Sequence, residues 1–145
     1  MTSLESHLRK IREHLEAIRD CIDRGIENKP VTLGFHCSAC SVEILELYLH
    51  KINKVPISKV LKHNWFKQPT LEQKKEPLAD RKVGAQFPEK AKIFDLLYQI
   101  ESLRDTLIYG NPTPQDIEKV IVSFQNLKSI LITKLKMEGI DLEKE

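Results

Sequence analysis

The sequence predicts an all-α protein: an up-down bundle of four to five helices, formed as one domain by residues 1–145. Four long segments carry apolar residues at spacings of three and four, which is the pattern of an amphipathic helix packed on one face. The chain has only five glycines, and no segment shows the alternation typical of a half-buried strand. Short links between the first and second segments, and between the third and fourth, favour antiparallel helix pairs.

Residues 2–24 are predicted to form the first helix. Thr2 and Glu5 have the spacing of a capping box, and Gly25 followed by Pro30 predicts the end of the helix. The apolar residues form a single stripe, made of Leu4, Leu8, Ile11, Leu15, Ile18 and Ile22.

Residues 32–54 are predicted to form the second helix, and their apolar residues surround most of its circumference. A helix of this kind is central in a bundle or is shared with another chain. Ser38, Ala39 and Ser41 are small and permit the close approach of a neighbouring helix. We therefore expect a homodimer.

Residues 55–87 are predicted to be an irregular excursion from the bundle. The stretch 58–66 is compatible with a short helix that directs Val60, Leu61 and Trp65 inward. The stretch 68–84 is polar, contains two prolines and has little periodicity, so we expect a long loop there.

Residues 88–109 and 114–137 are predicted to form the third and fourth helices. Pro88 suits the first position of the third helix, and the Gly-Asn-Pro sequence between the two helices ends it. Thr113 is the expected N-cap of the fourth helix, with Pro114 at the first helical position.

The charge balance argues against one class of function. The chain has 23 basic and 21 acidic residues and a net charge of +2, which is too balanced for nucleic-acid binding by bulk electrostatics. No apolar run approaches the roughly 18 residues of a membrane span, and the first residues lack the apolar core of a signal peptide. We expect a cytoplasmic protein without a membrane partner.

The three cysteines are Cys21, Cys37 and Cys40, and an odd number argues against a disulfide framework. Cys37 and Cys40 form a lone CxxC beside His36. A structural zinc site needs four ligands and usually a second paired motif, so these residues would bind zinc only if packing brought Cys21 to them. Small residues packed in the core are the interpretation that we adopt, and we expect no metal and no cofactor.

The end of the third helix carries the residues that we predict to bind a ligand: Arg104, Asp105 and Tyr109. The planar guanidinium of Arg104 suits phosphate. Arg104 and Tyr109 are about 140° apart on a regular helix, so they converge only if the last turn is distorted or a dimer supplies the partner's copy. In the alternative interpretation, Arg104 pairs with a carboxylate and Tyr109 packs through its ring.

A further candidate is the stretch from His63 to Lys67, where Trp65 and Phe66 lie beside basic residues. Aromatic side chains in such a setting can stack on nucleic-acid bases. The alternative is that Trp65 anchors the core. For His7 and His50 the sequence suggests no partner.

Two stretches, 35–49 and 103–112, resemble the second helix and the motif helix of the HEPN family of small helical proteins. In that resemblance Arg104 matches the Arg of the Arg-polar-x-x-x-His motif, and Asp105 stands at its polar position. Tyr109 replaces the His, and Asn111 stands where a toxin branch of the family often has Tyr. The resemblance implies a helical bundle, usually homodimeric, with the motif in a cleft at the dimer axis. Many members are metal-independent ribonucleases, often toxins paired with a nucleotidyltransferase.

These observations predict a dimeric, HEPN-like module that binds nucleotide or RNA phosphate without efficient nuclease activity. A phenol with a pKa near ~10 does not replace an imidazole at neutral pH, so we lean towards a protein that is not an enzyme. The alternative is a metal-independent endoribonuclease toxin, paired with a nucleotidyltransferase, that uses Arg104 and a His from elsewhere, such as His36 or His63. A His within reach of Arg104 distinguishes the two.

Overall fold

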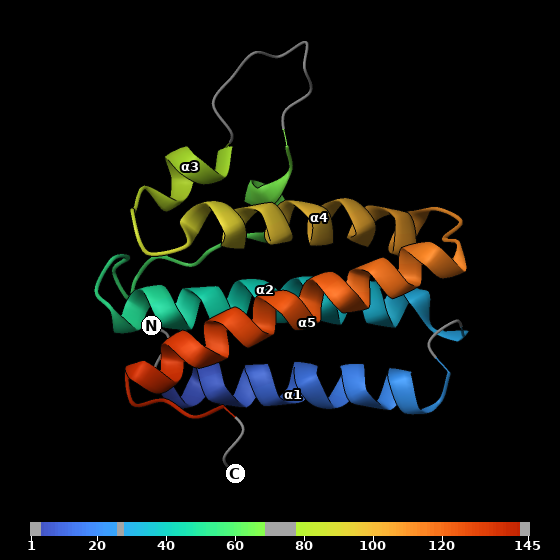
Figure 1. The fold of residues 1–145 in the computed structure, drawn as a ribbon, viewed down its shortest axis with the longest axis horizontal. Helices are drawn as coiled ribbons and strands as arrows, with labels where there is room; N and C mark the ends of the chain where they lie inside the picture. The colour runs from blue at the N-terminus through green and yellow to red at the C-terminus, as the bar shows by residue number, and fades with distance from the viewer. Residues whose placement is uncertain (1–3, 26–27, 69–77, 143–145) are drawn as a thin grey trace.

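The computed structural model describes residues 4–25, 28–68 and 78–142 and has an all-α fold (Figure 1). The all-α prediction is confirmed. The described residues form five α-helices and one short 3-10 helix: α1 (Leu4–Asp23), α2 (Pro30–Lys51), η2 (His63–Phe66), α3 (Leu78–Val83), α4 (Lys90–Tyr109) and α5 (Pro114–Met137). Among them, no helix is long and apolar enough to cross a membrane.

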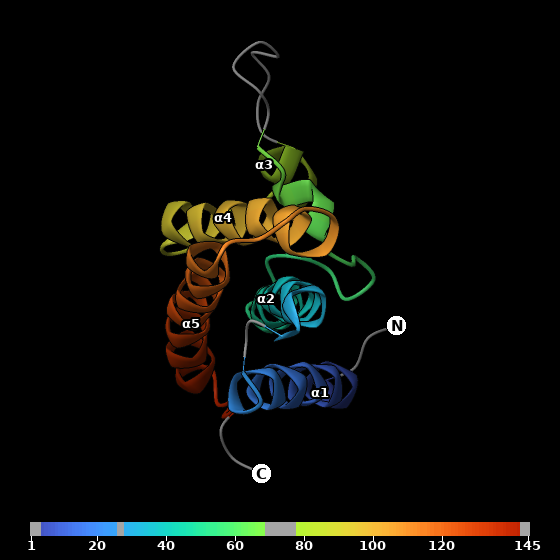
Figure 2. The same ribbon diagram turned by 90° about the vertical axis from the view of Figure 1, so that its right-hand side faces the viewer.

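The helix α2 lies at the centre of the bundle. Figure 2 shows α4, α2 and α1 stacked one above another, with α5 along one side of the stack. The closest packing joins α2 to α1 and to α4, and α5 packs on α4 and α2. This arrangement covers α2 from three directions, and it accounts within one chain for the apolar residues all around this helix. Its fully buried side chains include Leu33, Ile44, Leu45 and Leu49.

The fourth long helix, α5, has the predicted bounds and the predicted cap. The Thr113 hydroxyl accepts a hydrogen bond from the Asp116 N–H at 3.2 Å, and the Asp116 carboxylate accepts one from the Thr113 N–H at 2.9 Å. This reciprocal pair is a capping box in which Asp116 takes the place usual for Glu. The box fixes the start of α5 directly after the turn that follows α4.

The predicted start of α4 is wrong by two residues. The helix begins at Lys90, because Glu89 has a left-handed backbone with φ of 62° and interrupts the helical path after Pro88. For the first helix, α1 begins at Leu4, and the capping box expected at Thr2 lies outside the described residues. Its interior face contains not only Ile11 and Ile18 but also His7.

The segment between α2 and α4 has more structure than expected. The helix expected over 58–66 is reduced to the single turn of η2, and Val60 is 54% exposed instead of inward. The buried residue of this turn is Phe66, whose ring packs on Phe94 of α4. Inside the stretch predicted as a loop, residues 78–83 form α3, whose Ala79 and Val83 are buried. Residues 69–77 lie outside the described part.

Candidate functional site

A polar cluster forms where η2 crosses α4, and we call its five residues the η2–α4 cluster: His63, Lys67, Glu101, Arg104 and Asp105. His63 Nδ1 lies 2.9 Å from each carboxylate oxygen of Glu101. Arg104 Nη1 is 3.8 Å from Asp105 Oδ1, and Lys67 Nζ is 3.9 Å from Asp105 Oδ2. Basic groups from two separate segments thus surround two carboxylates.

Two features of the sequence build this cluster. Glu101, Arg104 and Asp105 are spaced by three and four residues, so they are neighbours on one face of α4. Phe66, only 1% exposed, packs edge-on against Phe94 with ring centroids 5.2 Å apart, and it holds η2 against α4. Since His63 opens the same short turn, this packing brings it to Glu101.

The electrostatics of the cluster depend on the burial of Glu101. Its side chain is buried, and desolvation raises the pKa of this carboxyl, while the hydrogen bond from His63 and the charge of Arg104 act in the opposite direction. His63 remains 40% exposed at its side chain. Its Nδ1 is hydrogen-bonded to Glu101, so its other ring nitrogen, Nε2, points away from this carboxylate.

Of the three residues predicted to form the site, Arg104 and Asp105 lie together and Tyr109 does not join them. Tyr109 is the last residue of α4 and is 78% exposed, so its side chain has few neighbours in the protein. The helix stays α-helical to that residue. The distortion that would bring the two side chains together is therefore missing, and they point about 140° apart.

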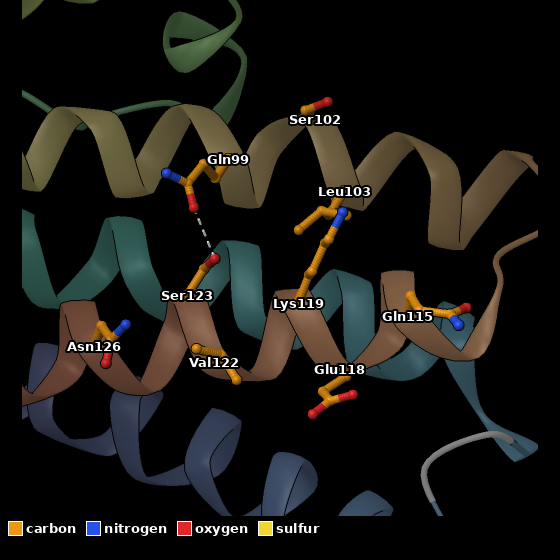
Figure 3. Close-up of a pocket in the computed structure, with 9 residues that line it drawn as sticks. All are labelled: Gln99, Ser102, Leu103, Gln115, Glu118, Lys119, Val122, Ser123 and Asn126. Atoms are coloured by element: carbon orange, nitrogen blue, oxygen red, sulfur yellow. Dashed lines mark hydrogen bonds between the residues drawn. The ribbon is translucent and has the colours of Figure 1, made fainter.

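A groove of about 640 Å³ lies between α4 and α5 (Figure 3). Its middle contains a hydrogen bond from the Ser123 hydroxyl to the Gln99 side-chain oxygen at 3.0 Å. Leu103 and Val122 add apolar surface. Arg104 does not line this groove, so the cavity and the η2–α4 cluster are separate features of α4.

A second polar cluster is buried between α1 and α2, and we call it the buried His–Glu cluster: His7, Glu43, Glu46 and His50. His7 Nδ1 is 2.6 Å from Glu43 Oε1, and His7 Nε2 is 3.0 Å from His50 Nδ1. His50 Nε2 is 3.0 Å from the carbonyl oxygen of Lys59. Glu46 accepts a hydrogen bond from the Leu61 N–H at 2.6 Å, and burial raises the pKa of its carboxyl.

Sequence reasoning missed the buried His–Glu cluster, although a signal was present. His36, Glu43 and His50 are seven residues apart on α2, and His7 and His14 are seven apart on α1. A spacing of seven places residues on the same side of a helix. These polar residues on two antiparallel helices therefore predict polar contacts along the α1–α2 interface, which we call the α1–α2 seam. The other residues of this interface are mainly apolar.

The other end of the same seam holds a pair of histidines. His14 Nδ1 and His36 Nδ1 are 2.9 Å apart. Burial lowers the pKa of both imidazoles, and the charge of His36 lowers that of His14 further. His36, one of the two histidines considered as a companion of Arg104, is thus engaged with α1.

The three cysteines are free and buried. Burial raises the pKa of the Cys37 thiol to about 12, and it raises the pKa of the Cys40 thiol as well. Metals bind the thiolate form of cysteine. The burial of Cys37 and Cys40 fits the interpretation of the CxxC as core packing.

The fold and these sites define a class: an all-α bundle with one polar cluster at the surface and another buried between two helices. Comparison of the chain with protein-family models, with curated proteins and with solved structures finds no match.

Proposed function

We propose that this protein is a HEPN-like helical module that binds a phosphate-bearing ligand, a nucleotide or RNA, at the η2–α4 cluster. One observation carries the proposal: His63 contacts Glu101, and Glu101 lies one helical turn before Arg104 on the same face of α4. A guanidinium next to an imidazole offers two kinds of donor to the same anion.

The contact distances within the cluster support an anionic ligand. The guanidinium of Arg104 is 3.8 Å from Asp105, and the ammonium of Lys67 is 3.9 Å from it, both beyond hydrogen-bond distance. Phosphate oxygens can approach a guanidinium at 2.7–2.9 Å in a bidentate arrangement. A phosphate would therefore make shorter contacts with these two cations than the carboxylate does.

The proposal is tested by measuring the affinity of the purified protein for a short single-stranded RNA and for ATP. We expect Arg104→Ala to weaken binding about 10- to 100-fold, the loss typical for hydrogen bonds to a charged group. Arg24→Ala is a matched control, because it removes the same charge from an exposed helix end, where Arg24 pairs with Asp20. Equal losses in the two variants would show that only net charge matters, and they would contradict the proposal.

The second candidate, a metal-independent endoribonuclease, is favoured by the same histidine. A His that donates Nδ1–H to a carboxylate has its Nε2 available to accept a proton, which is the arrangement of a general base. His63 would take the proton of an RNA 2′-hydroxyl, and Arg104 would hold the phosphate. In this candidate the acid–base group is His63 and not the residue at position 109.

The two candidates are separated by an RNA cleavage assay in the presence of a chelator. If the protein cleaves RNA, we expect His63→Ala to lower the rate about 10²- to 10⁴-fold, a larger factor than its effect on RNA affinity. Tyr109→Phe should leave both quantities unaltered, because this side chain is exposed. RNA binding without cleavage supports the binding module, and absence of both excludes RNA as the ligand.

A further inference from the structure

The buried His–Glu cluster is unusual in its location. His7 is 1% exposed, Glu46 is 3% exposed and His50 is 9% exposed, and all three lie within the hydrophobic core. Burying such groups costs free energy unless each is paired, and buried charges in proteins are paired or coordinate metals. The arrangement of donor atoms is compatible with a metal ion.

The atoms that can ligate an ion lie close to one another. One nitrogen from each histidine and a carboxylate oxygen of Glu46 all lie within 4.8 Å of one another. The two facing nitrogens, His7 Nε2 and His50 Nδ1, are 3.0 Å apart. Two ligand atoms of one tetrahedral zinc ion, each about 2.0–2.1 Å from the metal, are separated by about 3.3 Å. The two imidazoles therefore need little movement to share an ion.

The second ring nitrogen of each histidine has a hydrogen-bond partner, as is usual for histidines that bind metals. His7 Nδ1 lies against the Glu43 carboxylate, and His50 Nε2 donates to the backbone carbonyl of Lys59. Histidines that bind metals almost always use their other nitrogen in this way, which fixes the tautomer and directs the free nitrogen at the metal. Glu46 Oε1 accepts a hydrogen bond from the Leu61 N–H, and Glu46 Oε2 lies 3.7 Å from His7 Nδ1.

We propose that His7, Glu46 and His50 form a binding site for a divalent transition-metal ion of the zinc class. Two imidazoles and one carboxylate are donors that suit zinc, and they are not the all-oxygen set that suits magnesium or calcium. The carboxylates of Glu43 and Glu46 balance the two positive charges of the ion. Three protein ligands leave one position of a tetrahedral ion for a water molecule.

The site joins three parts of the chain. His7 comes from α1, Glu46 and His50 come from α2, and the backbone of Lys59 and Leu61 closes the site from the segment that follows α2. The same segment is attached to α3 by a hydrogen bond from Lys59 Nζ to the Val83 carbonyl oxygen at 3.4 Å. A bound ion would cross-link these parts and stabilise the bundle, because it binds the folded state only.

Without an ion, the same residues can satisfy one another. His50 Nε2 donates to a carbonyl, so its Nδ1 would accept a hydrogen bond from His7 Nε2–H, and His7 would share a second proton with Glu43. Such a hydrogen-bonded network would need no metal ion. The test must therefore detect the ion itself, and it must separate coordination from hydrogen bonding.

The protein of residues 1–145 is stripped of metal with a chelator, dialysed and titrated first with Co²⁺, whose visible absorption reports a tetrahedral site, and then with Zn²⁺. We expect one Co²⁺ per chain, displacement by Zn²⁺, and a higher melting temperature with Zn²⁺ bound. Glu46→Gln can still accept the Leu61 N–H through its amide oxygen, so it should fold and lose affinity at least about 100-fold. Glu43→Gln should lose about 10- to 100-fold, the usual cost of an outer partner.

His36→Gln is the matched control, because it changes a histidine of the same α1–α2 seam outside the cluster; it should bind Co²⁺ as the unmodified protein does. A folded, unmodified protein that gives no visible Co²⁺ absorption and no thermal shift with Zn²⁺ would overturn the proposal and identify a hydrogen-bonded network. Equal Co²⁺ binding by Glu46→Gln and the unmodified protein would overturn it as well, since the ion would then lie elsewhere.

Discussion

Phe66 is the residue on which the position of the proposed ligand site depends. It is only 1% exposed, and its ring contacts Phe94 and Tyr98 of α4 with centroid distances of 5.2 and 6.4 Å. His63 belongs to the same 3-10 turn. The contact between His63 and Glu101 therefore relies on an aromatic anchor that has no polar role of its own.

We expect Phe66→Ala to lower the free energy of unfolding by about 3–5 kcal/mol, the usual cost of removing a buried phenyl ring. It should also weaken ligand binding at the η2–α4 cluster, because His63 would no longer be held at Glu101. Chemical denaturation measures the first effect. Tyr109→Ala, which truncates an aromatic side chain that is 78% exposed, should change stability by no more than about 0.5 kcal/mol. Comparable losses in both variants would contradict this role of Phe66.

His14 and His36 predict how stability depends on pH. Burial lowers the pKa of both below the ordinary value of 6.5, and it outweighs the charges of Glu43 and Glu13 that act to raise the pKa of His14. Just below pH 6.5 the unfolded chain thus binds more protons than the folded protein, so stability is lost as the pH falls. Urea denaturation between about pH 7.5 and 5.5 measures the slope. Changing both residues to Gln should flatten it, and an unaltered slope would show that other groups dominate.

At the scale of elements, helix ends illustrate what local sequence can define. The start of α5 follows from Thr113, Pro114 and Asp116, which form a complete capping box within one turn of chain. The start of α4 does not follow from Pro88, because the left-handed backbone of Glu89 separates this residue from the helix. Each end is predictable when the residues that satisfy it are neighbours in sequence.

Thr113→Ala should therefore destabilise the protein by about 0.5–2 kcal/mol, the cost of losing an N-cap side chain. Thr133→Ala provides the control within the same helix, because Thr133 is exposed and its hydroxyl bonds only to the Ser129 carbonyl one turn earlier. Alanine has the higher helix propensity there, so this change should be neutral or slightly stabilising. A cap variant as stable as the control, measured by thermal or chemical unfolding, would refute the assignment.

At the scale of the whole molecule, the buried position of α2 changes the basis of the dimer prediction. The apolar circumference of this helix is covered by α1, α4 and α5, so it no longer requires a second chain. The large apolar side chains that stay exposed on α2 are Val31, at 52%, and Phe35, at 46%, one turn apart at its start. The homodimer stays a prediction, and this patch is where we expect its contact.

Light scattering should give twice the chain mass of 16.8 kDa at micromolar concentration. Phe35→Glu should shift the mass to that of one chain, since a charge in an apolar contact is costly. Val122→Glu, which adds the same charge at a position of α5 that is 47% exposed, should leave the dimer intact. If the unmodified protein has the mass of a single chain, the dimer prediction is wrong.

The sequence by itself determined the all-α class, the four long helices and the cap of α5. These features depend on apolar spacing and on capping residues within a few positions of one another, so they are local. It also identified Arg104 and Asp105 as neighbours, because adjacent positions on a helix stay adjacent in the fold.

Tertiary structure alone decided the partners across helices. His63 meets Glu101 across 38 positions of the chain, and His7 meets Glu43 and His50 across 36 and 43 positions. Periodicity shows which face of a helix is apolar, but it does not show which neighbour that face meets or at what height along the axis. These quantities are set by how side chains of several helices pack together. The sequence therefore offered His63 as a candidate, but its partner Glu101 and the assembly of the proposed metal site appear only in the packed bundle.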